Sequence, residues 1–345
     1  MNSNNKSIKL KRLFIIIGIS FFFIFFKEPS PPFISEKLEP IICSHQIGDN
    51  LKKNLVSTIK TTKKSLFLKA YQITDQTISR AIIEVLKNKN IIVDLECHEL
   101  KECSYFHTIK DNAQLNIKLN DKPKNKLMHM KILMIDECCF WIGSANFTDI
   151  SLCKESNLMV GFYSPELAEY VRSNRSCSFM INEQKIDFKV LPNDSRETLE
   201  YLIKTIDTSQ KYIKIAMFAF SHPKIMAALE NAYLRGVDVE IIIDKNYLKL
   251  TKQILKTTEA SVPVWYKTSK YRLHHKFAWI DEDILIFGST NWTMNGFNKN
   301  DECMLFLDNL TEKQNRKMRQ IWNNLTNKRE VLAEIIPFPI LFRAA

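Results

Sequence analysis

The sequence predicts an α/β protein made of two tandem repeats of one fold, and three observations lead to that prediction. First, 345 residues with 45% apolar and 25% charged content are typical of a packed globular chain. Disordered chains, collagens and small disulfide scaffolds are therefore excluded. Second, strand-like and helix-like apolar patterns alternate along the chain. Third, the chain is duplicated: the segment starting at Thr61 matches the one starting at Asp207, and the segment starting at Leu127 matches the one starting at Arg272.

The first element is an uncharged apolar run at residues 13–26, which basic residues precede and a proline-rich stretch follows. This layout is typical of a signal sequence. The run is shorter than the roughly 20 residues that span a bilayer comfortably, and no small-x-small cleavage site follows it. We predict that residues 1–27 form a signal or uncleaved anchor segment and that residues 28–45 form a linker. A buried core helix is disfavoured because the run is apolar on all faces.

Each repeat then begins with a strand, a helix and a second strand. Residues 65–71 and 212–218 show near alternation of apolar and polar residues, which predicts strands, and a helix-like apolar period follows each of them. In the second copy another strand is predicted at residues 237–243. A strand–helix–strand unit of this kind is a right-handed crossover that lays down parallel strands. We assign the repeats to residues 46–190 and 191–345.

Both copies then carry one polar motif, which reads HxK, four residues, D, six residues, GSxN. Its members are His129, Lys131, Asp136, Gly143, Ser144 and Asn146, and His274, Lys276, Asp281, Gly288, Ser289 and Asn291. Apolar stretches between them predict two strands joined by a tight turn. Residues two apart on a strand share a face, so the His and Lys of each copy point together, and the returning strand brings Ser and Asn beside them. A glycine at the same point of both copies suggests a sharp turn or a close backbone approach.

These side chains favour phosphodiester chemistry. Ammonium, hydroxyl and amide groups donate hydrogen bonds to oxygen, and two lysines supply enough positive charge to hold a phosphodiester without a metal or another cofactor. Histidine can act near neutral pH as a nucleophile or as a proton donor. With two histidines, one attacks phosphorus and the other protonates the leaving alcohol. A phosphohistidine forms, and water or another alcohol then releases it.

The doubled motif resembles the signature of the phospholipase D superfamily, and the resemblance covers about residues 50 to 325. It implies two α/β repeats packed about a pseudo-two-fold axis, a single active site between them, a phosphohistidine intermediate and no metal. Carried over by position, it makes His129 the nucleophile and His274 the general acid. The implied phosphate ligands, with the serines in support, are Lys131, Lys276, Asn146, Asn291, Ser144 and Ser289. For Asp136 and Asp281 we expect a structural or charge-orienting role.

The family also has a glutamate downstream of each motif that supports a histidine. Glu302 lies 28 residues after His274 and fits this position. In the first copy Glu155 follows His129 by 26 residues, whereas the residue at a spacing of 28 is Asn157. We assign Glu302 and Glu155 as supporting residues, and the departure leaves the carboxylate of the first copy open.

The sequence leaves the substrate open between two classes. A phospholipase D that hydrolyses glycerophospholipids to phosphatidic acid and an alcohol, with transfer to another alcohol or cardiolipin-synthase-type transfer as variants, suits the apolar N-terminal run. A metal-independent nuclease suits the net charge of +11 and the basic residues that precede both motifs, Lys122, Lys124, Lys126, Lys267, Lys270 and Arg272. A silent phosphate-binding module is disfavoured because it needs no second histidine.

The expected partners follow from these two hypotheses. They are a phospholipid or other phosphodiester substrate, a membrane reached through the N-terminal segment and, in the second hypothesis, nucleic acid. A monomer is expected because one chain carries both motifs. The signal-like start and the richness in Lys, Asn and Ile are compatible with export in an AT-rich bacterium, to the inner membrane, the periplasm or the exterior.

Overall fold

The computed structural model of the chain describes residues 34–98, 105–106, 109–120, 126–327 and 333–335. The predicted signal or anchor segment, residues 1–27, and the first part of the predicted linker lie outside the described residues. Within the described ranges, no helix combines the length and the apolar character needed to cross a membrane.

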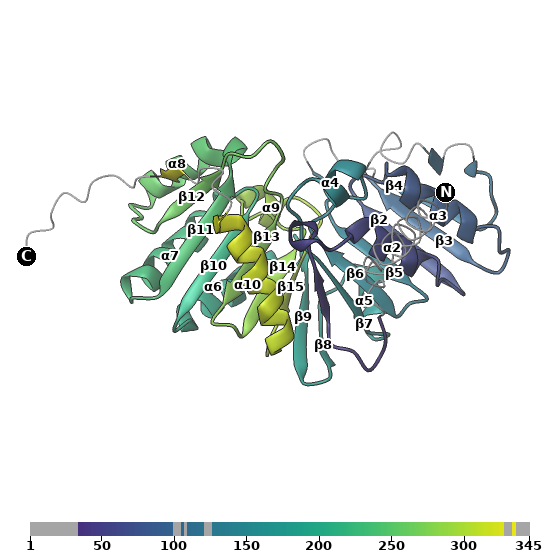
Figure 1. The fold of residues 1–345 in the computed structure, drawn as a ribbon, viewed down its shortest axis with the longest axis horizontal. Helices are drawn as coiled ribbons and strands as arrows, with labels where there is room; N and C mark the ends of the chain where they lie inside the picture. Colours follow the sequence, from purple (N-terminus) through teal and green to yellow (C-terminus); the bar gives the residue numbers. More distant parts are fainter. Residues whose placement is uncertain (1–33, 99–104, 107–108, 121–125, 328–332, 336–345) are drawn as a thin grey trace, which may run out of the picture. The chain divides into compact units, whose positions relative to one another are not determined.

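The first repeat forms a seven-stranded sheet in the order β1-β7-β6-β5-β2-β3-β4 (Figure 1). Its strands are β1 Ile41–Cys43, β2 Ser65–Ala70, β3 Ile92–Cys97, β4 Leu115–Leu119, β5 Lys131–Ile135, β6 Cys139–Gly143 and β7 Met159–Tyr163. Its helices are η1 His45–Ile47, α2 Leu51–Ile59, α3 Gln76–Val85, α4 Asp149–Cys153 and α5 Leu167–Ser173. Strands β2 and β3 run parallel with α3 between them in the chain, which confirms the predicted crossover.

The second sheet has nine strands in the order β16-β12-β11-β10-β13-β14-β15-β9-β8. Its strands are β8 Cys177–Ile181, β9 Gln184–Leu191, β10 Tyr212–Met217, β11 Asp238–Asp244, β12 Val264–Lys267, β13 Lys276–Ile280, β14 Ile284–Gly288, β15 Glu302–Leu307 and β16 Ala333–Ile335. Its helices are α6 Ser195–Thr208, α7 Pro223–Leu234, η3 Lys245–Tyr247, α8 Leu248–Thr257, α9 Met294–Asn298 and α10 Glu312–Asn327. Strands β10 and β11 are parallel, as predicted.

The two sheets share one arrangement. The order β7-β6-β5-β2-β3-β4 in the first sheet corresponds strand for strand to β15-β14-β13-β10-β11-β12 in the second. In both, the strand that follows the motif histidine lies at the centre and pairs antiparallel with the first strand of the repeat. The predicted duplication of an α/β fold is therefore confirmed.

The core lies in three layers that follow the alternation of the strands. One apolar cluster fills the space between the two sheets, and each sheet buries a second cluster on its other face. In β13, Phe277 and Trp279 belong to the central cluster, whereas Ala278 and Ile280 face the outer one. Because successive side chains of a strand point to opposite faces, one short apolar strand serves both layers.

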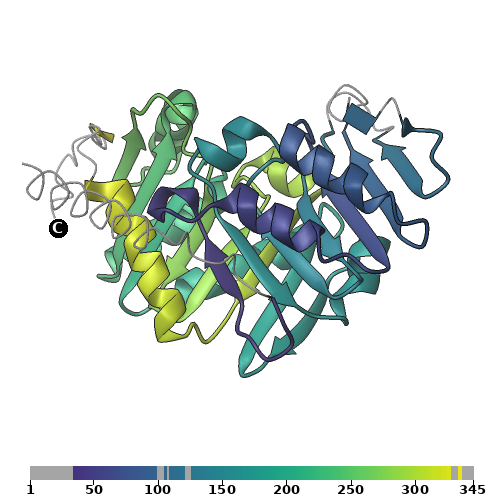
Figure 2. The ribbon, with the colours of Figure 1, turned by 45° about the vertical axis from the view of Figure 1, so that its right-hand side comes forward.

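The last long helix, α10, fastens the second repeat to the start of the first. Gln314 donates a side-chain hydrogen bond of 2.8 Å to the carbonyl of Pro40, and Asn324 donates one of 2.7 Å to the carbonyl of Gln46. Figure 2 shows this helix, in yellow, beside the purple segment that leads into α2. Residues from both ends of the described chain thus hold the two repeats together.

Candidate active site

Each motif histidine precedes a central strand and is held by the backbone of the other repeat. The N–H of His129 donates to the carbonyl of Asp301 at 2.8 Å, and the N–H of His274 donates to the carbonyl of Ser156 at 2.9 Å. A return hydrogen bond completes a short parallel bridge at each place. Asp301 and Ser156 occupy equivalent positions, 27 residues after His274 and His129. This exchange of equivalent contacts places the two histidines about one pseudo-two-fold axis.

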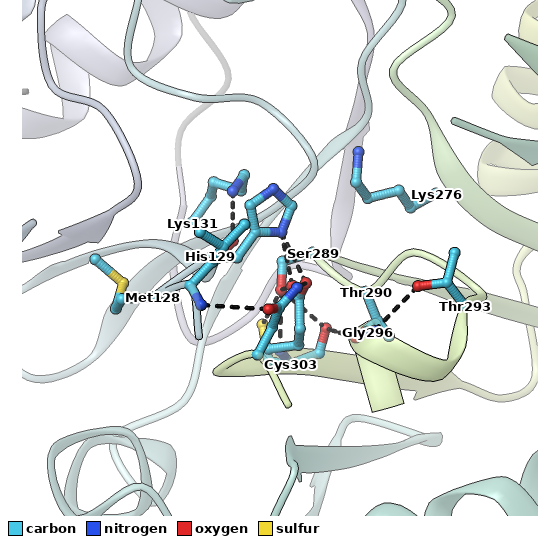
Figure 3. A network of polar contacts seen from close by, with 12 residues as sticks. Met128, His129, Lys131, Lys276, Ser289, Thr290, Thr293, Gly296 and Cys303 are labelled. Carbon is cyan, nitrogen blue, oxygen red and sulfur yellow. Dashed lines mark hydrogen bonds and ion pairs between the residues drawn. The ribbon is translucent and has the colours of Figure 1, made fainter. Parts of the chain in front are cut away.

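The side chain behind each imidazole also comes from the other repeat. Nδ1 of His129 lies 2.8 and 2.9 Å from the two carboxylate oxygens of Glu302, which accepts a 2.5 Å hydrogen bond from the hydroxyl of Ser289 (Figure 3). Nδ1 of His274 lies 2.9 Å from Oδ1 of Asn157. That amide oxygen accepts a 2.8 Å hydrogen bond from the equivalent hydroxyl, that of Ser144. We call His129, Lys131 and Glu302 the first half-site, and His274, Lys276 and Asn157 the second.

The two motif lysines are buried and point inward. The ammonium of Lys131 donates to the carbonyl of His129, and that of Lys276 donates to the carbonyl of His274 at 2.9 Å. Figure 3 shows the two ammonium groups on either side of the His129 ring. Burial lowers the pKa of Lys131 to about 8, and burial together with Lys131 holds the pKa of Lys276 well below its ordinary value. Two cations that influence each other in this way form a pocket suited to an anion.

The two imidazoles differ in their electrostatic surroundings. Desolvation lowers the pKa of His129, and the charge of Glu302 acts against that shift. Desolvation and the positive charges of Lys276 and Lys131 hold the pKa of His274 well below its ordinary value. No carboxylate acts on His274 as Glu302 acts on His129, so the first half-site retains a proton more readily than the second.

The glycines of the motif meet the predicted close backbone approach. A Cβ on Gly143 would lie 2.1 Å from the carbonyl oxygen of Leu158, and one on Gly288 would lie 2.3 Å from that of Cys303. Gly288 also has φ +145°, which favours glycine. The loops that follow carry Asn146 and Asn291, whose Oδ1 atoms are buried with no hydrogen-bond partner among the described residues. Their roles as phosphate ligands stay predictions.

The motif aspartates lie at the far end of the same strands. Asp136 and Asp281 begin the hairpin turns with φ +51° and +56°. Each carboxylate accepts hydrogen bonds of 2.7–3.1 Å from three consecutive backbone N–H groups, those of Lys63, Lys64 and Ser65 or those of Gln210, Lys211 and Tyr212. These contacts fix the turn to the start of the first strand of each repeat, which supports the expected structural role.

The structure places the two predicted supporting glutamates differently. Glu302 lies behind His129, whereas Glu155 lies 3.9 Å from Nε of Arg272. Asn157 occupies the position behind His274, and we had predicted no role for it. The spacing of 28 residues after each motif histidine was the signal that marks it.

Sequence reasoning also missed an aromatic side chain beside each histidine. The ring of Tyr71 lies 5.9 Å from that of His129, and the ring of Phe218 lies 4.8 Å from that of His274. Both aromatics directly follow the first strand of their repeat, whose last residue pairs with the motif lysine. Their equivalent places after Ala70 and Met217 would have revealed them. Among the described residues, no group of three or more His, Cys, Asp or Glu side chains is arranged to hold a metal ion.

Comparisons with known proteins agree with this geometry. The model of the family described as "Cardiolipin synthase, PLD-like domain" matches residues 55–175 and 202–325. Mitochondrial cardiolipin hydrolase of Mus musculus is 32% identical over 115 residues, 33% of this chain and 52% of that protein. The chain therefore matches about half the length of this relative. A phospholipase D of Rickettsia prowazekii is 23% identical over 174 residues, 47% of this chain and 85% of that protein.

The fold also matches solved structures. Phosphatidylserine synthase of Haemophilus influenzae superposes with a TM-score of 0.68 at 14% identity, over 84% of this chain and 87% of that one. At this identity the likeness shows the fold alone.

Proposed function

The chain belongs to the family of phospholipase D-like domains, and from this premise we propose that it is a metal-independent phosphodiesterase that works through a phosphohistidine. One observation carries the proposal: two histidines, each fixed by the other repeat, share a pocket with two buried lysines. Ammonium groups in a desolvated pocket stabilise the charge that develops on a phosphoryl group. The donor set is complete without a metal.

The proposed reaction has two steps. Because Glu302 holds Nδ1–H of His129, the lone pair of Nε2 is free to attack phosphorus. The bond to the leaving oxygen breaks, and that oxygen takes a proton from Nε2 of His274. In the second step His274 removes a proton from water, whose oxygen attacks the phosphohistidine and restores the nitrogen lone pair of His129. Each histidine ends as it began.

For the substrate we propose a glycerophospholipid, hydrolysed to phosphatidic acid and an alcohol. Support comes from the relatives, whose names refer to cardiolipin hydrolase and phospholipase D. The apolar N-terminal run at residues 13–26 further suits an enzyme that is anchored at, or exported across, a bacterial inner membrane. A second alcohol in place of water would give phosphatidyl transfer. A monomer suffices because one chain supplies both half-sites.

A nuclease is the second candidate, because cations and an aromatic ring gather next to the second half-site. Tyr271 is exposed, and the ammonium groups of Lys154 and Lys270 lie 5.9 and 5.6 Å from its ring centre. Arg272 follows in the chain, and the net charge is +11. Cations beside an exposed aromatic ring are also what proteins use to bind single-stranded nucleic acid.

One assay separates the candidates. The full chain in detergent, with EDTA, is incubated with phosphatidylcholine, phosphatidylglycerol, cardiolipin and single-stranded DNA. Release of phosphatidic acid without DNA cleavage supports the lipid substrate, and the reverse result supports the nuclease. Loss of activity when divalent metals are stripped contradicts the metal-free mechanism.

The roles of the histidines need a matched comparison. His129→Asn and His274→Asn should each abolish turnover, and substantial activity in either contradicts the role assignment. His222→Asn is the control, because His222 is also buried but caps helix α7 outside the site, where Asn is a good N-cap residue.

A further inference from the structure

The two half-sites are built alike except for the group behind the imidazole. Ser144 and Ser289 make the same hydrogen bond, to Asn157 in one case and to Glu302 in the other. Nδ1 of each histidine lies 2.8–2.9 Å from the oxygen that this serine contacts or from its carboxylate neighbour. One imidazole therefore faces a charge and the other a neutral amide.

The orientation of the Asn157 amide is fixed by Ser151. Nδ2 of Asn157 donates to the carbonyl oxygen of Ser151 at 2.9 Å and to its hydroxyl oxygen at 3.1 Å. A backbone carbonyl can only accept, so the NH₂ end must face it. The amide oxygen then faces His274, and because it too can only accept, Nδ1 of His274 must carry the proton.

The second repeat lacks this lock. The position equivalent to Ser151 is Gly296, where a Cβ would lie 2.2 Å from the carbonyl oxygen of Asn291. A carboxylate offers acceptors at both ends and needs no donor partner to orient it. Serine thus accompanies the amide and glycine the carboxylate, so the difference between the half-sites extends over two positions.

We propose that Asn157 is a positioning residue that holds His274 as the neutral Nδ1–H tautomer in the free enzyme, so that His274 takes up its second proton when an anionic phosphodiester binds. This inference rests on the proposed function, and it adds the origin of the acid's proton. The proton comes from solvent, binds Nε2, passes to the leaving oxygen and is replaced by one from the attacking water.

The charges around His274 support this coupling. The groups that act on it are Lys276 of β13, Lys131 of β5, the His129 ring and Arg272, and all of them disfavour a further positive charge. The nearest carboxylates are engaged elsewhere: Asp244 accepts the N–H of Leu273 at 2.9 Å, and Glu155 lies 3.9 Å from Arg272. A bound phosphodiester brings a negative charge into the pocket and favours the imidazolium.

The first test observes the ring itself. ¹⁵N-labelled full-length protein is titrated by NMR with and without sulfate, an anion whose charge is constant over the titration. In the free protein we expect His274 to stay neutral, with its proton on Nδ1, below the pH at which an ordinary histidine titrates. Sulfate should raise its pKa, and Asn157→Asp should raise it without sulfate. An ordinary titration in the free protein, or no change in Asn157→Asp, overturns the inference.

The second test uses turnover of bis(4-nitrophenyl) phosphate. In Asn157→Asp the fall of kcat/KM with rising pH should move upward by about one to three pH units, because an opposite charge adjoins the ring. KM should rise because the pocket loses net positive charge. Identical pH profiles for Asn157→Asp and the wild type overturn the inference.

Asn88→Asp is the matched control. Asn88 is exposed before β3, and its Oδ1 accepts one local backbone hydrogen bond, so the same chemical change occurs at the amino end of the sheet, away from the site. If Asn157→Asp fails to fold, Ser151→Gly loosens the same amide and should allow a mixture of His274 tautomers, and an unchanged single tautomer overturns the inference. A wild type inactive on every phosphodiester refutes the proposed function, whereas the NMR titration tests the inference independently.

Discussion

The first and second half-sites keep one scaffold and differ in the chemistry behind it. Both histidines are fixed by a backbone bridge to the other repeat, and both lysines donate to the carbonyl of their histidine. Behind the rings, a buried carboxylate meets His129 and an amide meets His274. Duplication therefore supplied two equal positions, and a change in the supporting residue gave the two imidazoles different proton affinities.

The largest expected effect comes from making the half-sites alike. Glu302→Gln gives His129 an amide partner, but its NH₂ end must then face a donor, either the hydroxyl of Ser289 or Nδ2 of Asn300. We expect kcat to fall by about 10²- to 10⁴-fold, the range over which a correctly held histidine contributes. Steady-state kinetics on one phosphodiester substrate measures the loss.

A charge-conserving swap sharpens that comparison. The double variant Glu302→Gln/Asn157→Asp has the wild-type net charge but moves the carboxylate to His274. If His129 is the nucleophile, the swap does not restore turnover. Recovery to wild-type rates would mean that the roles follow the carboxylate rather than the repeat.

The glycines test whether the repeats tolerate the same change. Gly143→Ala and Gly288→Ala both place a Cβ less than 2.5 Å from a backbone oxygen, so each should destabilise the fold by about 2 kcal/mol or more. Gly288→Ala should cost about 1–3 kcal/mol more because of its φ of +145°. Urea denaturation gives the free energy of unfolding.

Gly236→Ala is the control for that series, because Gly236 has φ +91° but nothing within 4 Å of an added Cβ. Its cost should be only the strain of the backbone, about 1–2 kcal/mol. Equal losses at Gly236 and Gly288 would show that the close approach to Cys303 carries no weight.

The sequence predicted those parts of the molecule that repeat. Periodicity located β2, β10 and the crossovers because apolar alternation is a local property, and the doubled motif located both histidines and lysines. The exchange of supporting residues between repeats was not predictable, because it depends on how two sheets pack. Asn157 stood at the right spacing, but an amide carries no sign of its role until Ser151 and His274 are seen around it.

The aspartates test what the half-sites share. Asp136→Ala and Asp281→Ala each remove the acceptor for three backbone N–H groups at a partly exposed turn. We expect about 2 kcal/mol loss in the free energy of unfolding from either change, with kcat close to that of the wild type. Loss of turnover at unchanged stability in one of them would give that aspartate a role in the reaction.

The smallest expected effect concerns the two lysines and pH. A lysine is charged below its pKa, so with the pKa of Lys131 near 8 the pocket loses a charge as the pH rises above 8. Competitive inhibition by sulfate should then weaken by up to about tenfold per pH unit, since one proton is linked to binding.

Arginine at either position separates the half-sites in that experiment. Lys131→Arg should flatten the pH dependence of sulfate inhibition, because a guanidinium stays charged throughout this range. Lys276→Arg places a permanent charge beside Lys131, whose proximity already lowers the pKa of Lys276, so the weakening should begin at a lower pH than in the wild type. Equal pH profiles in both variants would mean that the two ammonium groups do not share one anion-binding pocket.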